Sequence, residues 1–469
     1  MVFSDSVFLF MFLPLTLAVY YAVPFAFKNT VLFLTGLLFY AWGEPVYVLI
    51  MLLSTAIDYC AGRLMDRFDS NKKIRKATLL VSVVMNLSLL GIFKYGSFFI
   101  GSVNGIFGSA IPDPGLPLPI GISFFTFQSM SYTIDLYRRN IKVQKNFIDF
   151  AAFVTMFPQI VAGPIVRYED VSAQLACRRI DLRSMSDGIT RFVCGMCKKV
   201  LIANSIGALW TDVKAQDYAS MPAATAWLGI AAFTLQIYFD FSGYSDMAIG
   251  LGHMFGFTFL ENFNYPFIAK TATDFWRRWH MSLGTWFRDY VYFPMGGNRV
   301  KPARHIFNLL VVWFITGMWH GASYNFILWG GYYGVLIILE KYIYGKYLEK
   351  SHVISRIYFF FVTVFGFIIF DTENLSQVFS KFGELFGVGT TALYDTSSLF
   401  YVSSYLFTLV IAFVCAMPIG KKLRAKLCEK EKSRAVFTCL GYAACFAMLI
   451  VSTAYLIDGS YNPFLYFRF

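Results

Sequence analysis

Two histidines in unusual surroundings are the first candidates for chemistry. His320 stands in the sequence Gly-Met-Trp-His-Gly, at the end of an apolar run over 307–319 whose one strongly polar residue is Asn308. A neutral imidazole in such a place can act as a general base near pH 7. Gly317 and Gly321 flank this histidine, and we expect them to leave room for a substrate. A histidine that joins two helices by a hydrogen bond is the alternative.

The second histidine, His280, belongs to a stretch over 274–299 that is rich in aromatic and basic residues. Four aromatic residues at helical spacing predict one face of a single helix near the membrane interface: Trp276, Trp279, Trp286 and Tyr290. His280 falls on or near that face, where a hydrogen-bonded interfacial histidine is the alternative. Two histidines without a third ligand do not indicate a metal site. Haem held by two axial histidines is a further alternative.

Acidic residues also interrupt the apolar run over 223–253. Asp240 and Asp246 lie inside it, and ionisable residues at membrane depth are functional candidates by default. A hydrogen-bonded contact between helices is the alternative. We expect both carboxylates to fix helix geometry, and Asp246 is kept as a candidate for substrate binding. The Cys194–Cys197 pair offers only two ligands, so we expect it to pack as small apolar side chains.

The composition shows which elements must hold these residues. Of 469 residues, 57% are hydrophobic and only 14% are charged, whereas soluble domains carry about 25% charged residues. Mean hydropathy is +0.56. Apolar stretches recur from end to end, which excludes a water-soluble protein and predicts an all-α, polytopic membrane protein.

The net charge of +12 maps the membrane topology. The basic residues sit in short gaps between apolar runs, and short loops rich in Lys and Arg stay on the cytoplasmic side. This placement argues against a nucleic-acid partner. The loops over 211–222 and 372–397 hold more acidic than basic residues, so we expect them outside, together with both termini.

About 11–13 transmembrane helices result from this alternation. The run over 147–166 has basic flanks on both sides and is expected to enter and leave on one side, as a re-entrant segment inside protein. We expect one membrane domain over 1–469, with the motif-bearing region at about 236–331. The other expected spans are 7–25, 30–42, 46–60, 77–95, 120–137, 188–210, 223–253, 306–322, 325–343, 356–371, 398–418 and 435–457.

Several long motifs together resemble the membrane-bound O-acyltransferase family, in particular its bacterial alginate O-acetylation branch. They occur in family order, from the opening Met-Val-Phe-Ser-Asp-Ser to the closing Asn-Pro-Phe-Leu-Tyr-Phe-Arg-Phe. Between them lie the motif-bearing segments 118–127, 157–167, 240–250, 276–280, 292–299 and 317–321. The Tyr-Phe-Pro-Met-Gly-Gly-Asn-Arg element over 292–299 is similar to the alginate branch rather than to the D-alanyl transfer branch.

The resemblance implies a ring of tilted helices around a central cavity. It implies that His320 is the catalytic histidine and His280 the second functional position. His320 would take the proton of an acceptor hydroxyl, and His280 would hold or polarise the thioester. Other candidates for binding substrate or donor, the arginines also being possible membrane anchors, are Trp276, Arg277, Arg278, Trp279, Arg288, Asp246, Trp319 and Asn325.

The activity implied is transfer of acetyl groups from a cytoplasmic thioester, acetyl-CoA or another, for O-acetylation of an extracytoplasmic polysaccharide. No bound cofactor is implied. The expected partners are the donor, membrane lipid, and a polysaccharide or an extracytoplasmic acetyltransferase that completes the relay. The implied location is the cytoplasmic membrane of a bacterium. The alternatives are a flippase or transporter for lipid-linked sugars and a non-catalytic scaffold of a polysaccharide-modification complex.

Overall fold

The computed structural model describes residues 1–161, 163–179, 181–216, 221–390, 392–429, 431–458 and 464. This part of the chain forms helices and loops without a strand, so the predicted all-α class is confirmed. It divides into two compact units, Met1–Phe192 with Ser245–Leu260, and Val193–Tyr244 with Glu261–Phe469. The single domain expected over 1–469 stays a prediction.

The first unit is built from helices that follow one another closely along the chain. Two further helices, α10 (Leu182–Cys197) and α12 (Ala223–Met254), contribute residues to both units. The helices wholly within the first unit are η1 (Phe8–Phe12), α1 (Leu13–Ala22), α2 (Phe25–Gly43), α3 (Val48–Arg67), α4 (Lys72–Leu90), η2 (Gly91–Tyr95), α5 (Gly96–Phe107), α6 (Ile122–Arg138), α7 (Phe147–Thr155), α8 (Phe157–Ile160) and α9 (Tyr168–Ala176).

The second unit holds both candidate histidines and most of the aromatic core. Its helices are η3 (Lys198–Ala203), α11 (Asn204–Lys214), η5 (Pro266–Ile268), α13 (Ala272–Trp276), α14 (Met281–Phe287), η6 (Arg288–Tyr292), α15 (Pro302–His320), α16 (Tyr324–Leu339), η7 (Glu340–Tyr344), α17 (Gly345–Lys350), α18 (His352–Asp371), α19 (Gln377–Glu384), α20 (Thr396–Ala416), α21 (Ile419–Leu427) and α22 (Glu431–Asp458).

Eight helical segments of the described chain are long and apolar enough to cross a membrane, which makes this a multi-pass membrane protein. Three more helices, α6, α12 and α15, are 17 to 32 residues long and carry polar residues within their apolar runs. The count of 11–13 crossings stays a prediction. The eight segments are Phe25–Gly43, Val48–Arg67, Lys72–Phe107, Leu182–Lys214, Tyr324–Lys350, His352–Asp371, Thr396–Ala416 and Arg434–Asp458.

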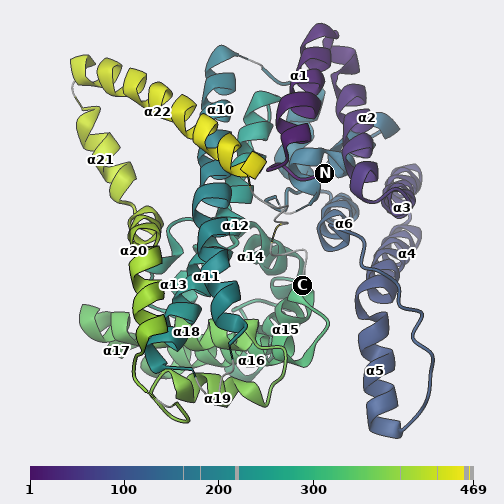
Figure 1. Cartoon of the computed structure of the whole chain (residues 1–469). Helices are drawn as coiled ribbons and strands as arrows, with labels where there is room; N and C mark the ends of the chain where they lie inside the picture. The colour runs from purple at the N-terminus through teal and green to yellow at the C-terminus, as the bar shows by residue number, and fades with distance from the viewer. Residues whose placement is uncertain are drawn as a thin grey trace. The chain divides into compact units, whose positions relative to one another are not determined.

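One predicted helix end is wrong. The span expected over 77–95 continues without a break through η2 and α5, so that Lys72–Phe107 is one helical segment of 36 residues (Figure 1). At a rise of 1.5 Å per residue it is about 54 Å long, more than the roughly 30 Å of a bilayer's hydrocarbon core. Gly96 does not end the helix, since a single glycine is tolerated inside an apolar helix.

The segment expected to be re-entrant consists of two short helices. α7 has 9 residues and α8 has 4, with a break at Met156, and every described side chain from Phe150 to Val161 is buried. Nine residues of helix span only about 14 Å, too little to cross a bilayer. Irregular backbone of this kind is stable at membrane depth only when protein surrounds it.

Polar side chains join α3 to α4 where the apolar surroundings offer no water. The Asp58 carboxylate accepts hydrogen bonds from Ser82 Oγ at 2.5 Å and from Asn86 Nδ2 at 2.8 Å, and Ser54 Oγ donates to Asn86 Oδ1 at 2.6 Å. All four residues are completely or almost completely buried. In lipid, such interhelical hydrogen bonds contribute to helix association together with close packing.

Glycines allow α15 and α16 to lie side by side (Figure 1). A Cβ atom added at Gly330 would clash with the carbonyl oxygen of Trp313, and one added at Gly317 would clash with that of Phe326. A Cβ at Gly321 would meet the ring of Phe326. The space beside these glycines is filled by α16, so the expectation that Gly317 and Gly321 leave room for a substrate is wrong.

This crossing gives a test with a matched control in the neighbouring residue. We expect Gly330→Ala to destabilise the protein by about 1–3 kcal/mol, because the added methyl group forces apart two packed helices. Gly331→Ala adds a methyl group to the same helix with nothing within 4 Å, and should stabilise it by up to about 1 kcal/mol through helix propensity. Thermal unfolding of the purified variants in detergent measures both, and equal melting temperatures would contradict the proposed crossing.

Candidate functional site

His320 is the last residue of α15 and lies in an aromatic cavity. Its side chain is 3% exposed, and its ring meets those of Trp329 and Phe370 edge-on, at centroid distances of 4.8 Å and 5.6 Å. The cavity is small and is lined by Ile237, Phe275, Trp276, Trp279, His320, Trp329, Tyr333, Phe367 and Phe370. The imidazole is therefore the one titratable group besides a tyrosine in an apolar chamber, which we call the His320 cavity.

The helix pair α15–α16 sets the position of His320. Gly317 is one turn before the histidine, and Gly330 directly follows Trp329, the residue whose ring meets the imidazole. The close helix contact at these glycines thus places Trp329 and Tyr333 of α16 against the same end of α15. α15 ends at His320, since Gly321 adopts an extended backbone.

His280 lies at a sharp turn rather than on a helix face. Its backbone is left-handed, with φ +46° and ψ +53°, and separates the five-residue helix α13 from α14. The single helix predicted over 274–299 is therefore wrong: Trp276 and Trp279 line the His320 cavity, whereas Trp286 and Tyr290 belong to later elements. The helical spacing of the aromatic residues could not reveal this break. A positive φ is uncommon for histidine, so the residue type gave no indication of a turn.

Asn262 fixes the orientation of the His280 ring. The Asn262 Oδ1 atom lies 3.0 Å from His280 Nδ1 and accepts hydrogen bonds from the backbone N–H and the hydroxyl of Ser282, at 3.3 Å and 3.0 Å. Because a backbone N–H donates to it, this atom is the carbonyl oxygen of the amide. His280 Nδ1 must then carry the proton, and Nε2 presents a lone pair.

The free nitrogen of His280 is buried among aromatic rings. The residue is 2% exposed, and Nε2 has no hydrogen-bond partner among the described residues. His280 lies outside the eight membrane-spanning segments, and burial lowers its pKa to about 3. The imidazole is thus neutral near pH 7 and offers an acceptor. In this state Nε2 accepts a hydrogen bond, and the expectation that His280 holds or polarises the thioester stays a prediction.

Trp319 connects the two histidines. Its ring lies 5.7 Å from that of His280 and 5.2 Å from that of His320, measured between centroids. The His280 ring also contacts the ring of Phe241 in a T-shaped arrangement, with 4.7 Å between their centroids. The structure therefore brings His280, Trp319 and His320 together, and their functional roles stay predictions.

Three arginines predicted to bind the donor do not line the His320 cavity. Arg278 donates to Asp274 at 2.8 Å, and Arg288 donates to its neighbour Asp289 at 2.9 Å. Arg277 is exposed. These side chains are available at the surface of the segment that carries Trp276 and Trp279, and any role in binding a phosphate stays a prediction.

Two further candidates make structural contacts. Asn325 follows the turn after His320, and its Nδ2 donates to the Phe370 carbonyl oxygen at 3.4 Å, so that it ties α16 to α18. Asp246 belongs to the first unit, where it accepts a hydrogen bond from Arg191 at 2.8 Å. The ion pair agrees with the expectation that this carboxylate fixes helix geometry.

Sequence reasoning missed Glu340, which supports the segment that carries Trp276. The buried Glu340 carboxylate accepts hydrogen bonds from the backbone N–H groups of Ala272 and Thr273, at 2.6 Å and 2.9 Å, and from the Tyr358 hydroxyl at 2.9 Å. It thereby caps the amino end of α13. Its signal in the sequence was a carboxylate that directly follows the apolar run over 325–339.

The described residues contain no group of three or more His, Cys, Asp or Glu side chains that could hold a metal ion. The His320 cavity is instead lined mainly by carbon. It suits an apolar or weakly polar reacting group from which water is excluded.

Comparisons with known proteins agree with these features. The model of the membrane-bound O-acyltransferase family matches residues 37–376. A protein of Azotobacter vinelandii named probable alginate O-acetylase AlgI is 36% identical over the whole of both chains. A peptidoglycan O-acetyltransferase of Helicobacter pylori is 33% identical over 81% of this chain and 77% of its own length. A teichoic acid D-alanyltransferase of Bacillus subtilis is 29% identical over 54% of this chain and 68% of its own.

The protonation state of His280 can be tested directly. We expect ¹⁵N NMR of histidine-labelled protein to show Nδ1 protonated, Nε2 unprotonated, and no titration of this ring between pH 5 and 8. In the unfolded chain the imidazole takes up its second proton with a pKa near 6.5. In the folded chain burial lowers that pKa to about 3. His280 therefore lowers the stability of the fold increasingly as pH falls from 6.5.

The chain has five histidines, so the spectrum of His280→Gln assigns the signal by its absence. A signal assigned in this way that titrates near pH 6.5 would contradict the buried, Asn262-bound geometry.

Proposed function

This chain belongs to the membrane-bound O-acyltransferase family and is an O-acyltransferase, and from that premise we propose its reaction. It transfers acetyl groups from a cytoplasmic thioester, acetyl-CoA or another, to a hydroxyl acceptor on the far side of the membrane. The acceptor belongs to a polysaccharide, or to a partner acetyltransferase that completes O-acetylation of the polymer. The observation that carries the proposal is a histidine, His320, enclosed in an aromatic cavity beside a second buried histidine.

His320 acts as the general base in the proposed reaction. Its imidazole takes the proton of the acceptor hydroxyl as the hydroxyl oxygen attacks the thioester carbonyl carbon. The tetrahedral intermediate then collapses, the carbon–sulfur bond breaks, and the thiolate leaves and takes up the proton from the imidazolium. The products are an acetyl ester and a free thiol. General-base catalysis of this kind contributes about 10²–10⁴-fold.

The aromatic lining supports transfer in preference to hydrolysis. Water that entered the His320 cavity would compete with the acceptor hydroxyl for the thioester. The rings of Trp276, Trp329 and Phe370 enclose the imidazole and leave little polar surface to retain water. A closed, apolar site also strengthens the electrostatic interactions within it.

His280 has a positioning role in this proposal. Because its Nδ1 proton is held by Asn262, only the Nε2 lone pair faces a ligand. It therefore accepts a hydrogen bond from an N–H or O–H group of the donor or the acceptor. Trp319, which contacts both histidines, sets the distance between that anchor and the general base.

We also propose the bacterial cytoplasmic membrane as the location, with both termini outside. Support comes from the basic loops predicted to face the cytoplasm and from the named bacterial relatives. The three relatives act, by their names, on alginate, peptidoglycan and teichoic acid. An alginate oligosaccharide without acetyl groups, chosen from the first of these names, is a suitable first acceptor for assays.

His320→Ala is the decisive variant. We expect transfer of labelled acetyl from acetyl-CoA to the acceptor by reconstituted membranes to fall by at least about 100-fold, because the general base is lost. The control is His352→Ala, which removes an exposed histidine at the start of α18, and should retain full activity at equal protein level.

Undiminished acetyl transfer by His320→Ala would overturn the proposal. The two alternatives have their own signatures. A flippase would move lipid-linked sugar without either histidine and without consuming thioester. A scaffold would leave the thioester intact in the purified wild-type protein and act only through a partner enzyme.

A further inference from the structure

Two buried cations lie close together in the first unit, where α1 is followed by α2. Lys28, in the first turn of α2, is 9% exposed, and Arg178, two residues beyond the end of α9, is 7% exposed. Both contact Tyr20 of α1: Lys28 Nζ donates to its backbone carbonyl oxygen and Arg178 Nε donates to its hydroxyl, each at 2.8 Å. The two positive charges are near enough to repel each other. We call these side chains the Lys28–Arg178 pair.

No acidic side chain of the described residues forms an ion pair with Lys28 or Arg178. Asp149 is connected to the pair only through Asn29. The Asn29 amide donates to the Asp149 carboxylate at 2.8 Å, and its oxygen accepts a hydrogen bond from Arg178 Nη1 at 2.8 Å. One neutral amide therefore separates this carboxylate from the guanidinium.

The end of α12 supplies part of the missing negative charge. Arg178 Nε and the Tyr20 hydroxyl both donate to the Phe255 carbonyl oxygen, at 3.1 Å and 2.6 Å. Phe255 directly follows the last residue of α12, and the C-terminus of a helix is equivalent to about half a negative charge. Half a charge does not balance two cations. Because buried charges are stable only when they are paired, the Lys28–Arg178 pair requires a further anion.

The Lys28–Arg178 pair also has N–H groups left for such an anion. Arg178 Nη1 donates a second hydrogen bond to the Gln174 carbonyl oxygen at 3.2 Å, but Nη2 is buried and has no hydrogen-bond partner among the described residues. In the same part of the chain, Lys28 donates only to the Tyr20 carbonyl oxygen, whereas an ammonium group carries three donors. Two N–H groups on Arg178 and two on Lys28 therefore remain for a ligand.

Phe25 is the exposed neighbour of the guanidinium. Its ring centroid lies 5.2 Å from Arg178 Cζ and its side chain is 39% exposed, whereas Phe257, with its centroid 4.4 Å from Cζ, is completely buried. Exposed side chains change rotamer within picoseconds to nanoseconds. A rotation of Phe25 therefore gives a small anionic group access to the guanidinium, while Phe257 keeps the guanidinium in place.

A phosphate group matches these donors. Arginine binds phosphate oxygens in a bidentate manner and lysine binds them as a point charge, so a single phosphate offers enough oxygens for both side chains. The basic gaps that contain Lys28 and Arg178 are predicted to face the cytoplasm. That side of a membrane carries anionic phospholipid headgroups and is in contact with soluble phosphate compounds.

We propose that the Lys28–Arg178 pair is a phosphate-binding site, in which Arg178 Nη2 and Lys28 Nζ hold one phosphate group. The phosphate belongs to a phospholipid headgroup of the cytoplasmic leaflet or to a soluble phosphate compound, and the same N–H donors serve both. Tyr20 and Asn29 position the two cations. The site belongs to the first unit and does not rest on the proposed reaction, whose histidines belong to the second.

Binding to the purified full chain, freed of lipid in a neutral detergent, tests this site. The probes are dioctanoyl phosphatidylglycerol and inorganic phosphate, and dioctanoylglycerol serves as the lipid without phosphate. We expect at least one of the two phosphate probes to bind wild type. Lys28→Met should weaken that binding by about 10–100-fold, and Arg178→Lys, which keeps the charge but removes Nη2, by about 10-fold, because each loses hydrogen bonds to a charged group. Melting temperatures without a probe check that both variants are folded.

Lys142→Met is the matched control. It makes the same chemical change at an exposed lysine in a loop predicted to face the same side, so it should bind the probes as wild type does. Phosphatidylglycerol binding that inorganic phosphate does not displace identifies a lipid headgroup as the ligand, and binding of inorganic phosphate itself identifies a soluble one. The site would be overturned if wild type bound neither probe, if dioctanoylglycerol bound as tightly as phosphatidylglycerol, or if Lys28→Met and Arg178→Lys both kept the affinity of wild type.

Discussion

The crossing of α15 and α16 is the contact on which the candidate site depends. Gly317 and Gly330 let the two backbones approach more closely than any side chain would permit. His320 lies one turn beyond Gly317, and Trp329 lies directly before Gly330, so the same contact places the imidazole against its aromatic wall. In lipid, where apolar side chains gain little by leaving their solvent, close packing at small residues is a main source of helix association.

Buried hydrogen bonds also stabilise the irregular segment over 262–282. Glu340 caps the amino end of α13, and Asn262 binds both His280 and Ser282. Each of these buried side chains satisfies several backbone or side-chain groups that have no access to water. Non-helical backbone requires such partners wherever water is excluded. The left-handed backbone at His280 is therefore stabilised by the Asn262 side chain, which contacts both His280 and Ser282.

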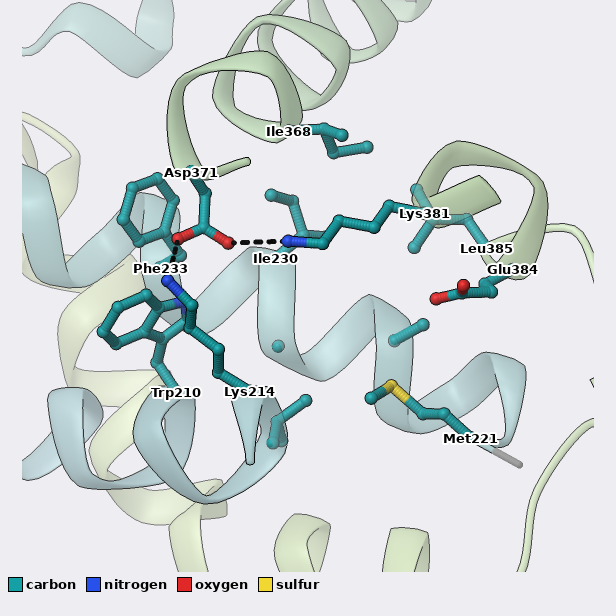
Figure 2. A pocket seen from close by; sticks show the side chains of 13 residues that line it. Trp210, Lys214, Met221, Ile230, Phe233, Ile368, Asp371, Lys381, Glu384 and Leu385 are labelled. Atoms are coloured by element: carbon teal, nitrogen blue, oxygen red, sulfur yellow. Dashed lines mark ion pairs between the residues drawn. The ribbon is translucent and has the colours of Figure 1, made fainter. Parts of the chain in front are cut away.

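Two cavities of the second unit differ in polarity. The His320 cavity is lined almost wholly by aromatic residues. The other is lined in part by Lys214, Asp371, Lys381 and Glu384, with Asp371 between the two lysines (Figure 2). Both use α12 and α18, and successive residues such as Phe370 and Asp371 face different cavities because neighbouring residues on a helix point about 100° apart.

The sequence by itself determined that this is a helical membrane protein, and it singled out His280 and His320 as the candidate histidines. Hydropathy and charge placement are properties of local segments, so they predicted an all-α membrane protein, and the motifs around His280 and His320 indicated the family. The run over 147–166 forms two short buried helices, and its re-entrance stays a prediction. Only the tertiary structure decided that the helix expected through 274–299 breaks at His280, that Gly317 makes room for α16, and that Asp371 bridges two lysines. The reason is physical: each of these outcomes is set by a partner on another element, such as Asn262 for His280 or Phe326 for Gly317, and the periodicity of one segment carries no record of such partners.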